Sequence, residues 1–566
     1  MTPNKRLSGG RKSLVWAVGI NALFLVLALI LMPPAFEAND DLTLAAFADG
    51  QMSVKCTYIP YINYVLALIL NGLYRLLGEG VTWHTVGQYA LLFASFTAVS
   101  YVLFRRLHKW QAALISLVML LFYGVDCYMI ISYTKTAGVC AVGGMALLFF
   151  SREDVGKNER LACTAVGIAL CLFGFGLRMM EFLPCMAIMA VLGLRWLYSL
   201  LFNGKELSAK EKLLAFWRYV RPFLLMLALA GVLFAADKFA WSQGRWAEYS
   251  RFDAVRVAYS DYGRPEYEDM SGEYDALGVS ETSARLLYEG NYFDPDVFDA
   301  ELMSAISEVR ESRFPPPSLG ECLGKFLDKC IPGFFTELHV YAFLLIAVLW
   351  LCAGEHDLRG WLTLAGVCGL FGLFYLYLIY RGRYLVDRVD VSLFFAMFAA
   401  LSWTIRPERL EKEKTLSALV LIAALFFSFY LNRGSFRSAE RPDLSFEREA
   451  VDMLLSDTEH IYLAKLDTVN DTLYPPFTPA PAGYWDRIVL LGGWDCNHPA
   501  IMDILSRYGI SNPYRDLVGN EHAYIIDDNI DLTLAHIHEF YDADASAELV
   551  QPLSDLTGLT IYRILD

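Results

Sequence analysis

Runs of apolar residues long enough to cross a bilayer recur along the first 431 positions of the chain, separated by short polar segments. A helix needs about 20 such residues to span the hydrocarbon core. The pattern therefore predicts a multi-pass α-helical membrane protein. We expect about eleven transmembrane helices, near residues 14–32, 85–104, 110–125, 130–150, 161–177, 182–202, 222–240, 338–353, 361–380, 390–405 and 415–431.

The run at 60–77 (PYINYVLALILNGLYRLL) is ambiguous, because Asn63, Asn71 and Arg75 interrupt it. Such a segment suits a helix that lies in the membrane interface. The charges of the short loops favour this interpretation, since Lys and Arg in short loops stay in the cytoplasm. If 60–77 does not cross, the basic N-terminus shares one side with the basic clusters at 105–109, 152–160, 205–221 and 406–414. We therefore expect a cell-membrane protein with a cytoplasmic N-terminus and an extracytoplasmic C-terminus.

Polar segments divide the chain into two predicted domains. A transmembrane domain, 1–431, includes a first outer loop at 33–84 and a large outer loop at 241–335. A domain at 432–566 follows on the outer face. In this second domain apolar runs of strand type alternate with helical patterns, which is typical of an α/β domain. The strands are expected at 461–466, 487–493 and 523–527, and the helices at 498–508 and 530–541.

Composition narrows the function classes. Hydrophobic residues make up 56% of the 566 residues, and the formal net charge of −15 is concentrated in the two outer polar segments. Nucleic acid is not an expected partner, because its binding needs a concentrated basic face. The nine histidines and eleven cysteines show no spacing typical of a zinc site.

Two adjacent carboxylates, Asp40 and Asp41, follow the first predicted helix in the sequence MPPAFEANDDLTLAAFADG. Asn39 and either aspartate would suit the N-cap of a helix that begins near Leu42. One side chain is enough for a cap, however, and two carboxylates at a low-dielectric boundary are costly. The pair is therefore also a candidate functional site.

The layout around this pair resembles the GT-C membrane glycosyltransferases, which include protein O-mannosyltransferases and the aminoarabinose transferase of lipid A. The resemblance covers a short tail, one span, an acidic pair in the first outer loop, a segment ending in LYRLLG and a span ending in FRRLHKW. It implies that Asp40 or Asp41 is the general base toward an acceptor hydroxyl, or helps to hold a divalent cation such as Mg²⁺ or Mn²⁺. The more usual Asp-Glu or Glu-X-Asp is replaced here by Asp-Asp, which leaves open which residue is the base; we favour Asp41.

Candidate cations for a departing phosphate lie at the outer end of the span 361–380. The segment LYLIYRGRYLVDRVDVS contains Arg381, Arg383 and Arg388 on the expected side of the acidic pair. Sugar transfer from a lipid phosphate needs a base for the acceptor proton and fixed cations where negative charge develops. Arginine suits the second role through its bidentate fork. The alternative is that these arginines contact lipid headgroups or pair with Asp387 and Asp390.

Further polar residues are expected at the outer ends of spans. Lys135 and Asp126 are predicted to pair with each other, and so are Arg178 and Glu181. Lys135, Arg178 and Glu181 could instead line a substrate cavity, since charges within the membrane rarely face lipid. The segment GGWDCNHP at 492–499 is expected to be a structural turn, with Trp494 and Asp495 as possible contacts to glycan.

The function that we expect is transfer of a sugar from a polyprenyl-phosphate-linked donor to a cell-envelope acceptor on the outer face. The expected partners are this donor, membrane lipid, and an acceptor that is a glycan, lipid or protein. A transporter or flippase of a lipid-linked glycan is a second candidate, although no repeated halves are visible. A polysaccharide polymerase or ligase is a third candidate, and a noncatalytic scaffold is a fourth.

Overall fold

The computed structural model describes residues 3–37, 40–52, 55–203, 208–261, 263–383, 386–412, 445–466, 474–553 and 559–566, together with Val420 and Ala424. Within these ranges, eight helical segments are long and apolar enough to cross a membrane. They are α1 (Pro3–Leu31), α4 (Trp83–Arg106), the segment from α5 (Lys109–Met119) to α6 (Val125–Met129), α7 (Tyr133–Phe150), α8 (Lys157–Leu177), α9 (Met179–Tyr198), α10 (Ala209–Trp241) and α18 (Leu358–Tyr380).

The helix α7 forms the centre of the bundle, and all of its residues are buried. It packs against α4, α8, α9 and α19 (Asp387–Trp403). Its small residues allow close approach, because a Cβ on Gly144 would lie 2.8 Å from the carbonyl oxygen of Gly167 in α8. Small residues at such contacts are what membrane helices need in order to pack tightly.

The number of spans differs from the eleven expected. The helix α17 (Leu338–Ala353) is preceded by a helical segment, Leu319–Phe334, that is bent by 94° from it, and this pair would make a ninth span. The expected span at 390–405 is α19, which has 17 residues. The expected span at 415–431 lies outside the described residues apart from two isolated positions.

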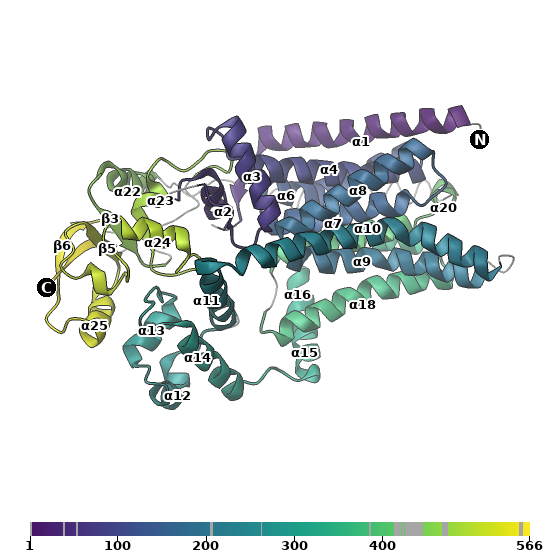
Figure 1. Cartoon of the computed structure of the whole chain (residues 1–566). Coiled ribbons are helices and arrows are strands. Elements are labelled where there is room, and N and C mark those ends of the chain that lie inside the picture. Colours follow the sequence, from purple (N-terminus) through teal and green to yellow (C-terminus); the bar gives the residue numbers. More distant parts are fainter. Residues whose placement is uncertain are drawn as a thin grey trace.

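The segment at 60–77 forms α3 (Tyr64–Leu77), a helix of 14 residues. At about 1.5 Å per residue it is roughly 21 Å long, which is shorter than the hydrocarbon core of about 30 Å. In Figure 1 it lies across one end of the bundle, next to α2 (Asp40–Asp49). Its length and position agree with a segment that does not cross the membrane.

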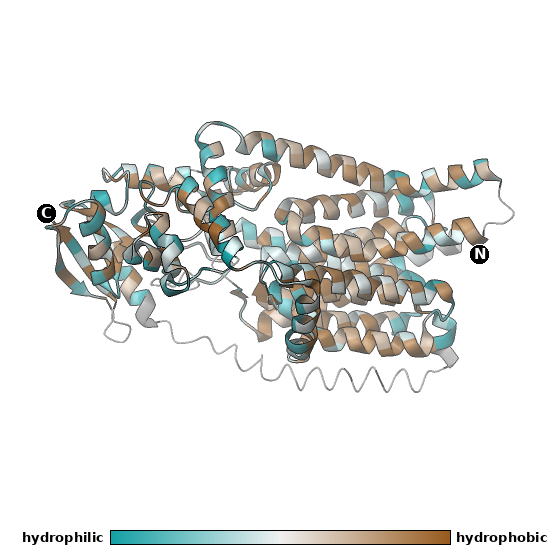
Figure 2. Cartoon of the chain, turned by 90° about the horizontal axis from the view of Figure 1, so that it is seen from below, coloured by the Kyte–Doolittle hydropathy of each residue, from teal (hydrophilic) through white to brown (hydrophobic). Residues whose placement is uncertain are grey.

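Polar parts of the chain gather at this same end of the bundle, and the N-terminus lies at the opposite end (Figure 1). Figure 2 shows hydrophobic residues along the length of the bundle and hydrophilic residues toward its ends and in the C-terminal part. At the end of the bundle that carries the N-terminus, Arg106 in the last turn of α4 forms an ion pair with Glu153. Arg195 in the last turn of α9 forms an ion pair with Glu355. Basic short loops are thus separated from α2 by the length of the bundle. Which end faces the cytoplasm stays a prediction.

The large outer loop is mostly helical. It contains α11 (Gly244–Ser260), α12 (Ser271–Ala276), α13 (Glu281–Glu289), α14 (Ala300–Arg313), α15 (Leu319–Lys325) and α16 (Ile331–Phe334).

The C-terminal part contains a five-stranded sheet in the order β4-β3-β5-β7-β6. The strands β3 (Ile461–Ala464), β4 (Ile488–Leu490) and β5 (Ala523–Asp527) lie where the sequence predicts them, and β3 is parallel to both neighbours. The expected helices correspond to α24 (Pro499–Ser506) and α25 (Ile530–Phe540). The sheet also contains an antiparallel pair that the sequence pattern did not predict, β6 (Ser546–Pro552) and β7 (Thr560–Leu565). Two further helices, α22 (Ser445–Ser456) and α23 (Tyr484–Arg487), complete this part.

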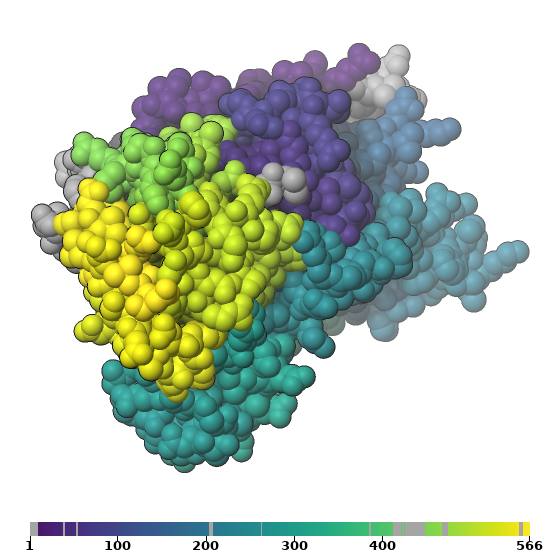
Figure 3. Space-filling view, turned by 60° about the vertical axis from the view of Figure 1, so that its left-hand side comes forward, coloured from purple at the N-terminus to yellow at the C-terminus, as the bar shows by residue number. Residues whose placement is uncertain are grey.

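The outer loop and the C-terminal part form one body, which Figure 3 shows as teal and yellow surfaces in direct contact. The backbone N–H of Phe293 donates to the carbonyl of Leu491 at 2.9 Å. The N–H of Leu466 donates to the side chain of Asn291 at 2.8 Å. These bonds attach the outer loop to the ends of β3 and β4.

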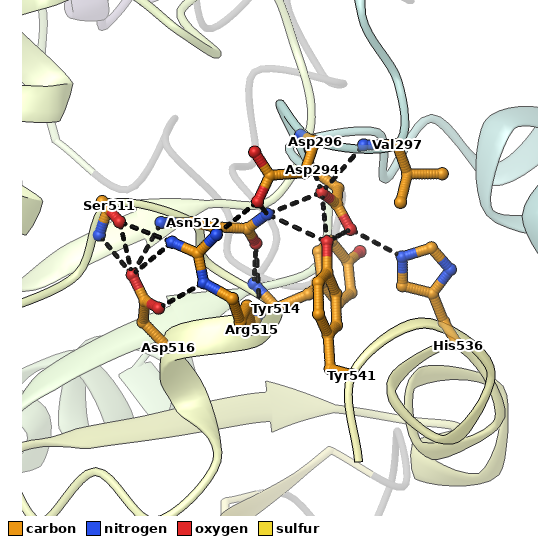
Figure 4. A network of polar contacts seen from close by, with 10 residues as sticks. All are labelled: Asp294, Asp296, Val297, Ser511, Asn512, Tyr514, Arg515, Asp516, His536 and Tyr541. Carbon is orange, nitrogen blue, oxygen red and sulfur yellow. Dashed lines mark hydrogen bonds and ion pairs between the residues drawn. The ribbon is translucent and has the colours of Figure 1, made fainter. Parts of the chain in front are cut away.

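A buried polar network strengthens this attachment (Figure 4). Asp294 of the outer loop accepts hydrogen bonds from Asn512, Tyr541 and His536 at 2.7, 2.7 and 2.8 Å. Burial would raise the pKa of Asp294, but these hydrogen bonds outweigh it and hold the pKa below its usual value. The carboxylate is therefore charged and fully paired, as a buried charge requires.

Candidate active site at the α2 end of the bundle

The chain leading into α2 is fixed by a short pairing of strands. β1 (Ala35–Phe36) lies parallel to β2 (Ile130–Ile131), between α6 and α7. Beside it, Lys135 lies 2.5 Å from Asp126 and 3.1 Å from Glu37. The expected pair of Lys135 and Asp126 is confirmed, and Glu37 joins it. Lys135 thus orders the segment before the acidic pair.

Asp41 is buried, with 1% of its surface exposed. Its Oδ1 accepts hydrogen bonds from Gln88 at 2.7 Å and His84 at 2.9 Å. The backbone N–H of Tyr133, the first residue of α7, donates to both carboxylate oxygens at 3.1 and 3.2 Å. The carboxylate therefore stabilises the N-terminus of α7, where negative charge is favourable, and connects α2 with α4 and α7.

Asp40 lies in different surroundings, at the surface where α2, α19 and the C-terminal part meet. Its side chain is 18% exposed. Arg388 of α19 donates to Oδ2 at 3.3 Å, and the indole N–H of Trp494 donates to Oδ1 at 3.0 Å. The structure thus brings together an aspartate, a late arginine and the tryptophan of the segment 492–499.

A second arginine, Arg178, lies beside this cluster. Its guanidinium is 4.7 Å from the ring centroid of Tyr61 and 5.2 Å from that of Tyr133, and it donates to the Tyr133 hydroxyl. Burial opposes its charged form, but Tyr133, Tyr61 and Asp40 outweigh that effect and raise the pKa of Arg178. Asp40 therefore lies in the field of two guanidinium groups.

The expected ion pair between Arg178 and Glu181 is wrong, because no such contact exists between these two described residues. Arg178 has an extended backbone at the junction of α8 and α9, whereas Glu181 lies within α9. Glu181 is buried and accepts a hydrogen bond from Ser392 of α19. The junction turns the two side chains to different neighbours.

The three late arginines have different partners. Arg388 contacts Asp40. Arg383 forms an ion pair of 2.7 Å with Asp261, at the end of α11. Arg381 lines a groove between α18 and the outer loop.

The segment 492–499 is held against the bundle from several sides. Tyr249 of α11 donates to the carbonyl of Trp494 at 2.7 Å. His498 is fully buried, contacts the carbonyl of Tyr58 at 3.1 Å and packs 4.4 Å from the ring of Phe47 in α2. Burial lowers the pKa of His498 to about 3. The imidazole is therefore neutral at physiological pH.

Local backbone strain occurs at the same place. Among the described residues, the non-glycine residues with positive φ are Tyr61 and Asn497, at 66° and 60°. Each such conformation costs about 1 kcal/mol or more. The Tyr61 ring lies 5.6 Å from Trp494, and its hydroxyl accepts a hydrogen bond from Arg256 at 3.1 Å. Sequence reasoning did not find Tyr61, because no pattern marks a strained loop residue.

The surroundings of the aspartates do not fit a protein-built metal site. Hydrogen-bond donors surround Asp41, and a guanidinium faces Asp40. Across the described ranges, no three His, Cys, Asp or Glu side chains gather as metal ligands would. We therefore derive no step through a divalent cation.

Comparison with known proteins gives two structural neighbours. No protein-family model and no curated protein matches the chain. Two crystal structures of ArnT from Cupriavidus metallidurans are similar to it, each with a TM-score of 0.39 and 12% identity. The match to the structure bound to undecaprenyl phosphate covers 97% of this chain and 97% of that chain. The match to the apo structure covers 96% of this chain and 98% of that chain.

A similarity at this TM-score assigns no role to any residue. The functional proposal therefore depends on the contacts of this chain alone.

Proposed function

We propose that the chain is a membrane glycosyltransferase that transfers a sugar from a polyprenyl-phosphate-linked donor to a cell-envelope acceptor. The observation that carries this proposal is the cluster of Asp40, Arg388 and Trp494. It combines a partly exposed carboxylate with a cation at the end of a membrane bundle. A base and a cation in contact are the two groups that such a transfer needs.

Asp40 is the general base in this proposal, against the preference for Asp41 drawn from the sequence. Asp41 is buried and its carboxylate is occupied by donors from α4 and α7. A base must reach the proton that it removes, and Asp40 is the more exposed of the two. Asp41 is then a positioning residue that holds α2 in place.

The reaction balances with these groups. Asp40 accepts the proton of the acceptor hydroxyl while the oxygen forms a bond to the anomeric carbon of the sugar. The bond from that carbon to the phosphate oxygen breaks, and the electron pair leaves with the polyprenyl phosphate. Arg388 and Arg178 stabilise the negative charge that develops on this phosphate.

The other late arginines have different roles in this proposal. The ion pair with Asp261 makes Arg383 a link between the α18–α19 turn and the outer loop. Arg381 belongs to the separate groove between α18 and the outer loop. Donor phosphate binding is therefore assigned to Arg388 and Arg178.

The test measures a product that does not depend on the identity of the sugar. Membranes that contain the full chain are given total polyprenyl-phosphate-linked sugars extracted from the source cells, and the release of polyprenyl phosphate is followed. Asp40→Asn is expected to lower the rate by at least about a hundredfold, as loss of a general base does. Asp387→Asn, an exposed carboxylate one residue before Arg388, is the matched control and should leave the rate unchanged.

Unchanged release in Asp40→Asn, with normal protein levels, would overturn the proposed base. Sealed vesicles distinguish a transferase from a transporter. A transferase changes the covalent product, whereas a flippase moves the intact lipid-linked sugar across the bilayer without releasing polyprenyl phosphate.

A further inference from the structure

A groove of about 390 Å³ lies between the outer loop and the end of α18, apart from the contacts of Asp40. Three arginines from different elements line it: Arg264, which follows α11, Arg310 of α14 and Arg381 at the end of α18. Two exposed acids, Asp269 and Glu311, lie on its wall.

Arg310 is the most informative of these residues. It is buried, with 8% exposure, and its guanidinium donates to the carbonyls of Tyr259 and Gly263 at 3.2 and 3.0 Å. Within the described part of the chain, no carboxylate lies at ion-pair distance from it. A buried cation without an ion-pair partner is costly, and the charge of Glu311 offsets only part of that cost. Burial, more than any neighbour, lowers the pKa of Arg310.

The other two arginines increase the positive charge of the groove. Arg381 lies close enough to repel the charge of Arg310. The Arg264 guanidinium forms no hydrogen bond or ion pair with any residue that the structure describes. One of its amino groups packs against Gly290, and its remaining donors are available to a ligand. Two or three converging guanidinium groups match the oxygens of a phosphate through paired hydrogen bonds.

The position of the groove indicates where this phosphate comes from. Tyr380, which also lines the groove, ends the membrane helix α18 and is 49% exposed. Tyrosine is enriched where a span meets the interface. Nearby, α15 packs against α18. It belongs to the helical segment Leu319–Phe334, which is bent by 94° from α17. Exposed leucines recur every four residues along this segment, at Leu319, Leu323 and Leu327. This apolar face suits a helix lying in the membrane surface.

We propose that this groove binds the phosphate of a membrane lipid, at a site distinct from the donor phosphate site at Asp40. The guanidinium groups of Arg264, Arg310 and Arg381 hold the phosphate, and the apolar chains lie along the leucine face of α15. The inference goes beyond the proposed transfer reaction, because none of the groups around Asp40 takes part in it.

The experiment uses the full chain in phosphatidylcholine nanodiscs, with phosphatidic acid as the probe and native mass spectrometry to measure retained lipid. Arg264→Gln and Arg381→Gln are each expected to weaken retention about tenfold, the effect of losing a charged hydrogen bond. Arg310→Lys keeps the charge but loses the fork, and it should fall between these variants and the wild type. The matched control is Arg285→Gln on α13, an exposed arginine paired with Glu281 at 2.5 Å.

Each outcome decides the proposal. Selective loss of phosphatidic acid in the groove variants, with full retention in Arg285→Gln, supports it. Equal retention in all variants overturns the site. If inorganic phosphate at equal concentration displaces phosphatidic acid completely, the ligand is a soluble phosphate and the lipid assignment is overturned. Release of polyprenyl phosphate, measured on the same samples, shows separately whether the transfer reaction holds.

Discussion

Two neighbouring aspartates have different surroundings because successive residues of a helix point about 100° apart. Asp41 points into the bundle, where Gln88, His84 and the start of α7 donate to it. Asp40 points to the surface that carries Arg388 and Trp494. The same chemistry therefore serves stability at one position and, in our proposal, catalysis at the next.

This difference predicts opposite effects of substitution on stability. Asp41→Ala leaves three buried donor groups without an acceptor and should cost about 3 kcal/mol. Asp40→Ala removes a partly exposed carboxylate and should change stability much less. The thermal midpoint of the purified protein in detergent checks this. Similar midpoints for the two variants would contradict the assignment of Asp41 as a buried positioning residue.

At the scale of elements, the segment 492–499 is held in place by a close backbone approach. A Cβ added at Gly492 would lie 3.0 Å from the carbonyl carbon of Gly290 and closer still to its oxygen. Gly492 therefore permits the outer loop to lie directly against the ends of β3 and β4. Trp494, two residues later, reaches Asp40 from this position.

Gly492→Ala should consequently separate the outer loop from the sheet. We expect a loss of about 1 to 3 kcal/mol, as for overpacked sites, and a lower rate of polyprenyl phosphate release because Trp494 moves. Gly272→Ala in α12 is the control, since a Cβ there meets nothing within 4 Å. Limited proteolysis of the outer loop and the release assay would measure both effects. Wild-type behaviour of Gly492→Ala would show that the contact has no role.

At the scale of the whole molecule, His498 joins the bundle to the outer body, because it contacts Tyr58 and Phe47 while capping α24. Its pKa is about 3 in the folded protein and about 6.5 in an unfolded chain. Below pH 6.5 the unfolded state binds the proton more readily, so the contribution of His498 to stability falls as the pH is lowered toward 3.

The free energy of unfolding of the wild type should exceed that of His498→Gln by an amount that decreases by about 1.4 kcal/mol per pH unit below 6.5. Thermal midpoints of the two proteins between pH 7.5 and about 4.5 test this. The stability of the variant must be subtracted from that of the wild type at each pH, because Asp49 is present in both proteins. Burial raises the pKa of Asp49 to about 7, so its contribution to stability grows as the pH falls over part of this range. A constant difference would contradict the prediction.

The separation of the two ends of the bundle predicts the accessibility of engineered cysteines. Gly320→Cys, exposed on α15, lies at the end that carries α2, and Lys157→Cys, exposed at the start of α8, lies at the other end. In intact cells a membrane-impermeant maleimide should label the first variant and not the second. Labelling of Lys157→Cys before permeabilisation would reverse the proposed orientation.

Local sequence patterns predicted several elements and one contact of the structure. Apolar runs predicted most of the membrane helices, and alternating runs predicted β3, β4 and β5. Spacing at adjacent helix ends predicted the pair of Lys135 and Asp126. The sequence pattern did not predict the pair β6 and β7, because its apolar and polar residues alternate weakly and β6 is almost entirely exposed.

The sequence by itself determined that this is a multi-helix membrane protein with an acidic pair after its first helix and an α/β part at its end. Hydrophobic length and periodicity carry that information, and both are properties of neighbouring residues. The tertiary structure alone decided that Asp40, and not Asp41, meets Arg388 and Trp494. These residues lie hundreds of positions apart, and their meeting depends on how helices rotate and pack, which local pattern does not encode.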